Sequence, residues 1–296
     1  MEKKYFGPLR FAHRGLVQYA PENTLEAYQA AAEHGIEAIE IDVRLSADGE
    51  IVCAHDANFT KMTIGNPKGH RIDRIRELTW EQIRAIDIPF VNHMLPTQLP
   101  NHSEDFLYAN CPGLIAGESD EHDYVGGWQR EKRVTHLCRF LDLDAWLSTA
   151  DTDLIVEVEV KDRGMMPRMR QILSASGNCS RYILFSGNRD IIEEIQREFK
   201  EDRPAGLRLG ANLNQLTEDA KALIERGDYY EVGLSPHRFN AADVQWLHDR
   251  GVELFVNVED HPDWWAQLMH CGAKGFKTNY AEAVGEWWEK NAAKAD

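Results

Sequence analysis

Four residues near the start of the chain have the types and the spacing that chemistry requires. Glu40 and Asp42 are separated by one residue within an apolar run, and His13 and His55 each follow another short apolar run. Side chains alternate across a β-strand, so Glu40 and Asp42 point to the same side, and two carboxylates held that close need a cation. Carboxylate oxygens are the preferred ligands of Mg²⁺ and Ca²⁺, so the pair predicts a site for one of these metals rather than for zinc.

Each of these signals has a simpler alternative when it is taken alone. Two acids on one strand face are also typical of an exposed edge strand, and a single histidine is commonly a structural hydrogen-bonding residue. His13 and His55 follow the runs 9–12 and 51–54, however, and parallel sheets carry their active sites at such strand ends. The combination of two histidines with an acidic pair therefore favours an active site.

A second charged strand is predicted over 154–160. Glu157, Glu159 and the following Lys161 share one face, and valines fill the other. Inside a barrel, three such charges are costly to bury without a metal and an anion to pair with them, although the same pattern is common on exposed strands. Glu157 is expected to lie deeper and to pair with a neighbouring core residue.

Short apolar runs alternate with amphipathic stretches along most of the chain. After the first strand, which ends before His13, the barrel strands are expected at 38–43, 154–160, 182–185, 205–209, 231–234, 252–258 and 275–277. Helices are expected at 24–34, 141–147, 167–174, 189–199, 218–226, 241–250, 264–270 and 281–291. Eight strands with helices between them predict an α/β fold, a closed (β/α)₈ TIM barrel rather than an open doubly wound sheet.

Several short motifs in the N-terminal part occur in a specific order. They are His13-Arg14-Gly15, Pro21-Glu22-Asn23-Thr24, Glu40-Ile41-Asp42-Val43, Asp48-Gly49, Val52 and His55-Asp56. This series resembles the N-terminal signature of the glycerophosphodiester phosphodiesterase family. The resemblance implies a TIM barrel that hydrolyses glycerophosphodiesters to glycerol phosphate and an alcohol with a divalent metal and two histidines.

The resemblance also extends to two later parts of the chain. The Glu-x-Lys pair is similar to the family's third metal ligand and phosphate-contacting lysine, which implies these roles for Glu159 and Lys161. Residues 57–140 are rich in Pro, Gly, His and acids and resemble the family's inserted subdomain after the second barrel strand, within one domain over 1–296. One helix is expected in the insertion, at 79–86.

An acidic cluster in the insertion could be a second metal site or a solvated loop. Its members are Glu118, Asp120, Glu121, His122 and Asp123. The loop is favoured because the run lacks the spacing of a strand or helix that would hold a coordination geometry.

The chain departs from the family pattern near its C-terminus. Family members usually carry a Trp-Thr-Val-Asn type sequence at strand seven and a Gly-Ile-x-Thr-Asp type sequence at strand eight, where this chain has Phe255-Val256-Asn257-Val258 and Gly275-Phe276-Lys277-Thr278-Asn279. These changes leave the metal and histidine residues intact and alter the expected substrate-facing wall. His237, Asn257 and Glu259 are therefore candidate specificity residues.

Composition restricts the choice of partners. The chain has 296 residues with 33 Lys and Arg against 49 Asp and Glu, a formal net charge of −16, which argues against binding of nucleic acid or anionic membranes. An anionic substrate must then be attracted by local positive groups such as Arg14, Lys161 and the metal. No apolar stretch approaches the roughly 18 residues of a membrane span, and the N-terminus lacks the apolar core of a signal peptide, so a cytoplasmic location is expected. The five scattered cysteines are expected to be reduced thiols.

These observations combine into one expected mechanism. Glu40, Asp42 and Glu159 hold the cation, Mg²⁺ or Ca²⁺ with Mn²⁺ as an alternative, and Arg14 and Lys161 help to neutralise the phosphate. His13 and His55 act as acid and base, since histidine titrates near neutral pH. The resemblance implies that the glycerol 2-hydroxyl attacks phosphorus and that water opens the resulting cyclic phosphate.

Two other functions remain as alternatives. A related barrel phosphodiesterase acting on a lysophospholipid or sugar phosphodiester would need a membrane-facing apolar loop, of which the acidic insertion gives little sign. A glycerophosphodiester-binding protein without catalysis predicts the loss of a histidine or a metal ligand, and all of these residues are present.

Overall fold

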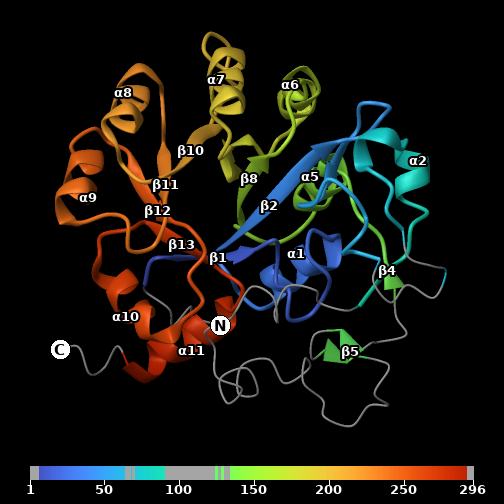
Figure 1. The fold of residues 1–296 in the computed structure, drawn as a ribbon, viewed down its shortest axis with the longest axis horizontal. Coiled ribbons are helices and arrows are strands. Elements are labelled where there is room, and N and C mark those ends of the chain that lie inside the picture. The colour runs from blue at the N-terminus through green and yellow to red at the C-terminus, as the bar shows by residue number, and fades with distance from the viewer. Residues whose placement is uncertain are drawn as a thin grey trace.

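Parallel strands close into a barrel around which the rest of the chain is arranged (Figure 1). The computed structural model describes residues 7–63, 68, 71–90, 124–125, 128–129 and 134–291. Within these residues the eight barrel strands are β1 Leu9–His13, β2 Ala38–Leu45, β8 Ile155–Val160, β9 Tyr182–Phe185, β10 Arg208–Asn214, β11 Glu231–Leu234, β12 Glu253–Val256 and β13 Gly275–Thr278. Because β1 pairs in parallel with both β2 and β13, the sheet has no gap between its first and last barrel strands. The predicted TIM barrel is confirmed.

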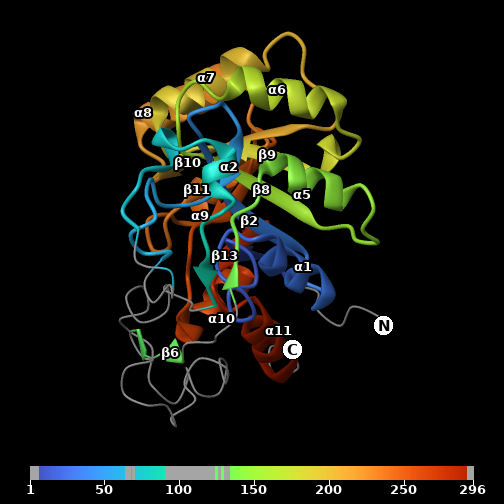
Figure 2. The same ribbon diagram turned by 90° about the vertical axis from the view of Figure 1, so that its right-hand side faces the viewer.

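Helices cover the outside of the barrel. They are α1 Leu25–Glu33, α5 Phe140–Leu147, α6 Met166–Ala175, α7 Arg189–Glu198, α8 Glu218–Arg226, α9 Ala241–His248, α10 Pro262–His270 and α11 Ala281–Asn291. Figure 2 shows α5, α6 and α7 packed along one side of the strands. None of the helices in the described part of the chain is both long enough and apolar enough to cross a membrane.

Side-chain caps fix where several of these helices begin. Thr24, Asn188, Thr217 and Asn240 each accept a hydrogen bond from a backbone N–H of the first helical turn. Such caps satisfy donors that have no partner inside the helix, so the chain leaves each preceding loop at a defined residue. The predicted cap at Thr24 is confirmed.

The fifth barrel strand was predicted too early, at 205–209. The structure places a turn there, with Leu207 N bonded to Pro204 O at 3.1 Å and Gly206 at a φ of +84°. A left-handed residue interrupts an extended strand, so β10 begins at Arg208 and continues to Asn214. The loop between α7 and β10 is therefore longer than the sequence indicated, and β10 reaches further towards the carboxyl end of the barrel.

A short additional strand brings the second predicted histidine back to the barrel. The chain turns at Gly49, which has a φ of +83°, into β3 Ile51–Cys53. β3 runs antiparallel to β2, with Cys53 opposite Val43. This hairpin returns the chain to the carboxyl end of β2, so His55 lies on the same side of the barrel as the end of β1.

Short elements form the described parts of residues 57–140. They are the 3₁₀ turn η1 Ile75–Glu77, α2 Trp80–Ile83, the antiparallel pair β4 Ile88–Pro89 and β7 Val134–Thr135, and the pair β5 Tyr124–Val125 and β6 Trp128–Gln129. The helix predicted at 79–86 is thus present as the shorter α2. Phe59, Met62 and Ile83 form an apolar cluster with Val52 and Ala54, which attaches the start of this segment to the barrel.

The subdomain boundaries at 57–140 stay a prediction, because much of the segment lies outside the described residues. The same holds for the acidic cluster of Glu118, Asp120, Glu121, His122 and Asp123, none of which is described.

The interior of the barrel contains an apolar layer and, above it, a layer of buried charge. Phe11, Ala38, Ile183 and Phe255 form a small apolar cluster from four inward-facing strand positions. Alternation along β2 and β1 places the next inward side chains, including His13, one step closer to the carboxyl ends. The apolar layer therefore supports the polar layers above it.

Glu157 is the core acid that the sequence predicted, and its partner is Lys277. The Lys277 ammonium lies 2.7 Å from Glu157 Oε1, and both side chains are at most 5% exposed. Glu231 lies beside them and is fully buried. Burial and the neighbouring Glu157 raise the pKa of Glu231 well above its ordinary value, whereas attraction by these two acids outweighs burial and raises the pKa of Lys277.

Replacing this lysine tests the buried ion pair. Lys277→Met should lower the free energy of unfolding by about 3 to 5 kcal/mol, since it leaves buried carboxylates without a cation. The matched control is Lys274→Met, which removes a lysine paired at 4.0 Å to Glu253 on the surface and should cost less than about 1 kcal/mol. Urea unfolding measures both, and equal effects of the two substitutions would contradict the account.

Candidate active site

The three predicted metal ligands come together at the carboxyl end of the barrel. One carboxylate oxygen from each of Glu40, Asp42 and Glu159 lies within 4.8 Å of the others. The parallel register of β2 and β8 causes this, because it places Asp42 beside Glu159. Glu40 and Asp42 are each 1% exposed, so the site is a buried acidic cluster and not an exposed strand face.

Two cations hold this cluster together. Lys161 Nζ lies 3.0 Å from Asp42 Oδ1 and 2.8 Å from Glu159 Oε2. Arg14 Nε lies 3.3 Å from Asp42 Oδ2, and Arg14 Nη1 lies 3.1 Å from Glu22 Oε1. The two residues expected to bind phosphate therefore contact carboxylates in this structure, and their contact with phosphate stays a prediction.

The charges around the cluster shift the pKa values of its two buried acids, Glu40 and Asp42, in opposite directions. Burial opposes ionisation of Asp42, but Lys161 and Arg14 outweigh it and hold the pKa of this carboxyl well below its ordinary value. Burial, together with the charges of Asp42 and Glu159, raises the pKa of Glu40 well above its ordinary value. Three neighbouring carboxylates with two cations thus leave one negative charge that is not compensated, and a further cation would compensate it.

The donor set fits a hard divalent metal. All three residues offer carboxylate oxygens, which Mg²⁺, Ca²⁺ and Mn²⁺ accept. Asp42 Oδ1 is buried and has the Lys161 ammonium nearby, but among the described residues it has no hydrogen-bond donor in good geometry. Its lone pairs are therefore available to a metal.

Asn23 positions Asp42, a role that the sequence analysis missed. Its amide donates to Asp42 Oδ2 at 2.9 Å, and its oxygen accepts from the Asp42 backbone N–H at 3.0 Å and from the Tyr28 hydroxyl at 3.0 Å. Asn23 has a φ of 56°, a left-handed conformation that asparagine tolerates better than most residues. The only signal in the sequence was its place in the Pro21-Glu22-Asn23-Thr24 motif, which shows no pairing.

The chain turns sharply after β1 and directs Arg14 into the site. Arg14 has a φ of 62° and Gly15 a φ of +91°. A Cβ on Gly15 would lie 2.7 Å from Ala27 Cβ, so α1 can pack this closely only against glycine. The turn also lets the Arg14 backbone N–H donate to Glu40 Oε2 at 3.2 Å.

The two predicted histidines occupy different environments. His13 is buried, its Nδ1 lies 2.9 Å from Asn279 Oδ1, and its Nε2 lies 3.9 Å from Glu40 Oε2. Burial, followed by the charge of Arg14, lowers the pKa of His13 well below its ordinary value. His55 is 32% exposed at its side chain, and its Nδ1 lies 2.8 Å from Asp56 Oδ1. The neutral imidazole of His13 thus faces the acidic cluster, while His55 has a carboxylate partner.

Asp260 was also missed, because nothing in its spacing relates it to a strand or to the acidic residues. It accepts three hydrogen bonds at 2.7 Å, from Thr278 Oγ1, the Asn279 backbone N–H and the Asn279 side-chain amide. Burial raises its pKa to about 6, although these hydrogen bonds favour the ionised form. Through these hydrogen bonds Asp260 connects the loop after β12 to the end of β13.

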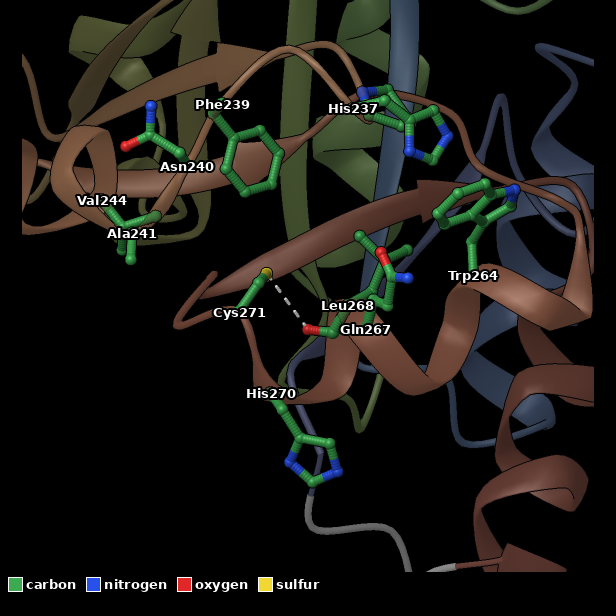
Figure 3. Close-up of a pocket in the computed structure, with 11 residues that line it drawn as sticks. His237, Phe239, Asn240, Ala241, Val244, Trp264, Gln267, Leu268, His270 and Cys271 are labelled. Carbon is green, nitrogen blue, oxygen red and sulfur yellow. Dashed lines mark hydrogen bonds between the residues drawn. The ribbon is translucent and has the colours of Figure 1, made fainter.

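Two of the three candidate specificity residues contact each other. His237 Nε2 lies 3.1 Å from Glu259 Oε2, and the His237 ring packs on Trp264 with a centroid distance of 3.9 Å. Figure 3 shows His237 and Trp264 at one end of a cavity of about 250 Å³ between α9 and α10. Asn257 instead donates to Asn212 Oδ1 at 2.9 Å. A role of these residues in specificity stays a prediction.

The pKa of Asp260 predicts a pH dependence of stability. The pKa is about 6 in the folded protein and 3.8 ordinarily, so the folded state binds the extra proton between these values. Stability from this group is complete below the ordinary pKa and falls as the pH rises through the folded one. In urea unfolding, the stability of the wild type relative to Asp260→Asn should decrease from about pH 4 to about pH 6 and then level off. A difference that stays constant or grows over this interval would contradict the raised pKa.

Similarity to known proteins extends over most of the chain. Residues 13–283 match the Glycerophosphoryl diester phosphodiesterase family. The glycerophosphodiester phosphodiesterase of Caldanaerobacter subterraneus subsp. tengcongensis is 35% identical over 283 residues, which cover 93% of this chain and 96% of that relative. Glycerophosphodiester phosphodiesterase 1 of Bos taurus is 41% identical over 90 residues, which span 30% of this chain and 25% of that protein.

Solved structures share the fold at low sequence identity. A glycerophosphodiester phosphodiesterase from Thermotoga maritima has a TM-score of 0.63 at 19% identity, covering 95% of this chain and 99% of that one. An Oleispira antarctica phosphodiesterase, in complex with the product sn-glycerol-3-phosphate, has a TM-score of 0.69 at 18% identity, covering 96% and 98%. The match of the family model over nearly the whole chain confirms the expected resemblance. The chain belongs to the glycerophosphoryl diester phosphodiesterase family.

Proposed function

We propose that this protein is a metal-dependent phosphodiester hydrolase that cleaves glycerophosphodiesters to glycerol phosphate and an alcohol. The observation that carries this proposal is the cluster of Glu40, Asp42 and Glu159 at the carboxyl end of the barrel, with two histidines and two cations from the neighbouring strand ends. Family membership supports the same chemistry. The product bound to the Oleispira antarctica phosphodiesterase supports glycerol phosphate as the product class.

Glu40, Asp42 and Glu159 would hold a divalent metal, Mg²⁺ or Ca²⁺ with Mn²⁺ as an alternative. When bound, such an ion supplies positive charge to the phosphate oxygens as negative charge develops on them. The chain's own contribution is to keep three carboxylates in place, with Asn23 fixing the orientation of Asp42 on two sides. Hydrogen bonds of this kind hold a metal-binding side chain in one orientation.

Lys161 and Arg14 are the groups that would bind the substrate phosphate. Lys161 is shared between Asp42 and Glu159, so a cation held by these oxygens would weaken its two contacts and would leave its ammonium available to an anion. Arg14 remains anchored by Glu22 through Nη1. Its fixed guanidinium supplies a directed positive group that a flexible exposed side chain would not.

His13 and His55 divide the proton transfers between them. His13 Nδ1 is hydrogen-bonded to the Asn279 oxygen, so Nε2 carries the free lone pair and faces the acidic cluster. We assign it as the base that takes the proton of the attacking hydroxyl, which is the glycerol hydroxyl next to the phosphate. His55 is assigned the complementary role, the acid that protonates the leaving alcohol, and the Asp56 carboxylate 2.8 Å from its Nδ1 orients the ring.

A substrate panel tests the proposed function. With Mg²⁺, Ca²⁺ or Mn²⁺ present, the protein should cleave at least one of glycerophosphocholine, glycerophosphoethanolamine and glycerophosphoglycerol, because the mechanism needs a hydroxyl beside the scissile phosphate. Phosphorus NMR identifies glycerol phosphate as the product.

Chelation should abolish turnover, and Glu40→Gln and Asp42→Asn should reduce it strongly without unfolding the barrel. Full turnover in metal-free buffer, or cleavage of lysophospholipids alone, would contradict the proposal.

Substitution of the histidines tests the acid-base assignment. His13→Ala and His55→Ala should each lower the rate by at least about 10²-fold, and the double variant should lose much less than the product of the two effects, because the residues act as a unit. His34→Ala is the matched control, since His34 pairs with Glu282 on the surface. If the two histidines are only structural, each substitution will lower the melting temperature and leave activity per folded molecule nearly unchanged.

A further inference from the structure

A buried chain of hydrogen bonds connects His13 to a carboxylate on another strand end. His13 Nδ1 lies 2.9 Å from Asn279 Oδ1, and Asn279 Nδ2 lies 2.7 Å from Asp260 Oδ2. His13, Asn279 and Asp260 are 9%, 2% and 6% exposed. They come from the ends of β1 and β13 and from the loop after β12. Because all three are buried, water has little access to these hydrogen bonds.

The carboxylate determines which way the Asn279 amide points. An asparagine amide has an oxygen and a nitrogen of nearly equal size, so its shape alone does not distinguish two orientations related by a half turn. An ionised carboxylate only accepts hydrogen bonds, so the amide nitrogen must face Asp260. The amide oxygen then faces His13, and the ring nitrogen opposite it must be a donor.

Asp260 itself has no freedom to turn away. Its Oδ1 accepts from Thr278 Oγ1 and from the Asn279 backbone N–H, each at 2.7 Å, which leaves Oδ2 directed at the Asn279 amide. The backbone donor cannot rotate, because it belongs to the chain at the end of β13. The backbone therefore fixes the position of Asp260, and its carboxylate, which can only accept, fixes the direction of the hydrogen bonds along the chain.

We propose that Asp260 is a positioning residue that holds His13 in the tautomer protonated at Nδ1, through the orientation it imposes on Asn279. This proposal rests on the assigned role of His13 as the base. With the proton on Nδ1, the lone pair on Nε2 faces the acidic cluster, where Glu40 Oε2 lies 3.9 Å away. The other tautomer would place a proton on that nitrogen, and His13 could not then accept one.

Asp260→Asn should turn the Asn279 amide around. The oxygen of the new amide at position 260 accepts the hydrogen bonds from Thr278 and the Asn279 backbone N–H, so its nitrogen must face the Asn279 side chain. The Asn279 amide then turns its oxygen towards residue 260 and its nitrogen towards His13, whose Nδ1 becomes an acceptor. We expect the imidazole ¹⁵N shifts of His13 to change from the Nδ1-protonated to the Nε2-protonated pattern, measured well above the Asp260 pKa of about 6.

A reciprocal variant should reverse the change. In Asp260→Asn combined with Asn279→Asp, the amide at 260 donates to the carboxylate at 279, whose second oxygen accepts from His13 Nδ1. The ¹⁵N pattern should return to that of the wild type. Thr278→Val is the control, because it removes one hydrogen bond from the same carboxylate without touching the Asn279 amide. It should lower stability and keep the wild-type ¹⁵N pattern.

Kinetics on the same preparations give the functional readout. Asp260→Asn should lower kcat by about 10- to 100-fold with little change in KM, the range typical for loss of a group that orients a functional residue through hydrogen bonds. The reciprocal variant should recover most of this loss. A wild-type ¹⁵N pattern in folded Asp260→Asn, or no recovery of this pattern in the reciprocal variant, would overturn the proposal. If the ¹⁵N patterns change as expected while the wild type cleaves no glycerophosphodiester, the proposed function fails and the positioning role of Asp260 stands.

Discussion

The structure depends on one electrostatic constraint, the close approach of three carboxylates at the mouth of a barrel. Glu40, Asp42 and Glu159 have oxygens within 4.8 Å of one another, and like charges this close repel strongly where water is excluded. Lys161 and Arg14 offset part of this repulsion, and the part that remains, together with burial, raises the pKa of Glu40. The cluster therefore retains an unmet preference for positive charge. A divalent metal would satisfy that preference and would supply the positive charge that an anionic phosphodiester needs.

The barrel satisfies this constraint by arranging its interior in layers. The apolar cluster around Phe11 and Phe255 fills the amino end, and the Glu157–Lys277 ion pair adjoins the acidic site, because Glu157 is in register with Glu40. Lys277 thereby adds positive charge close to Glu40. Helices outside the barrel add the remaining support, since Asn23, which fixes Asp42, stands one residue before the cap of α1.

The sequence predicted the residues of the site that lie on strands or directly follow them, and it missed two residues whose role depends on a loop conformation. Glu40, Asp42 and Glu159 could be found because alternation along a strand is a strong local rule, and Glu157 followed from the same rule. Asn23 and Asp260 act through loop conformations, a left-handed residue and a carboxylate bonded to the next strand end, which no periodicity encodes. The fifth strand was misplaced for a related reason, because the turn at Gly206 depends on a backbone conformation that the apolar pattern does not show.

The central claim is that the three carboxylates form a metal site and that Lys161 neutralises them when no metal is bound. Crystals soaked in Mn²⁺ and measured for anomalous scattering test it most directly. The account predicts a peak between Glu40, Asp42 and Glu159, with Lys161 Nζ moved away from its 3.0 Å contact with Asp42 Oδ1. The absence of a peak at this position, with Lys161 still bridging Asp42 and Glu159, would contradict it.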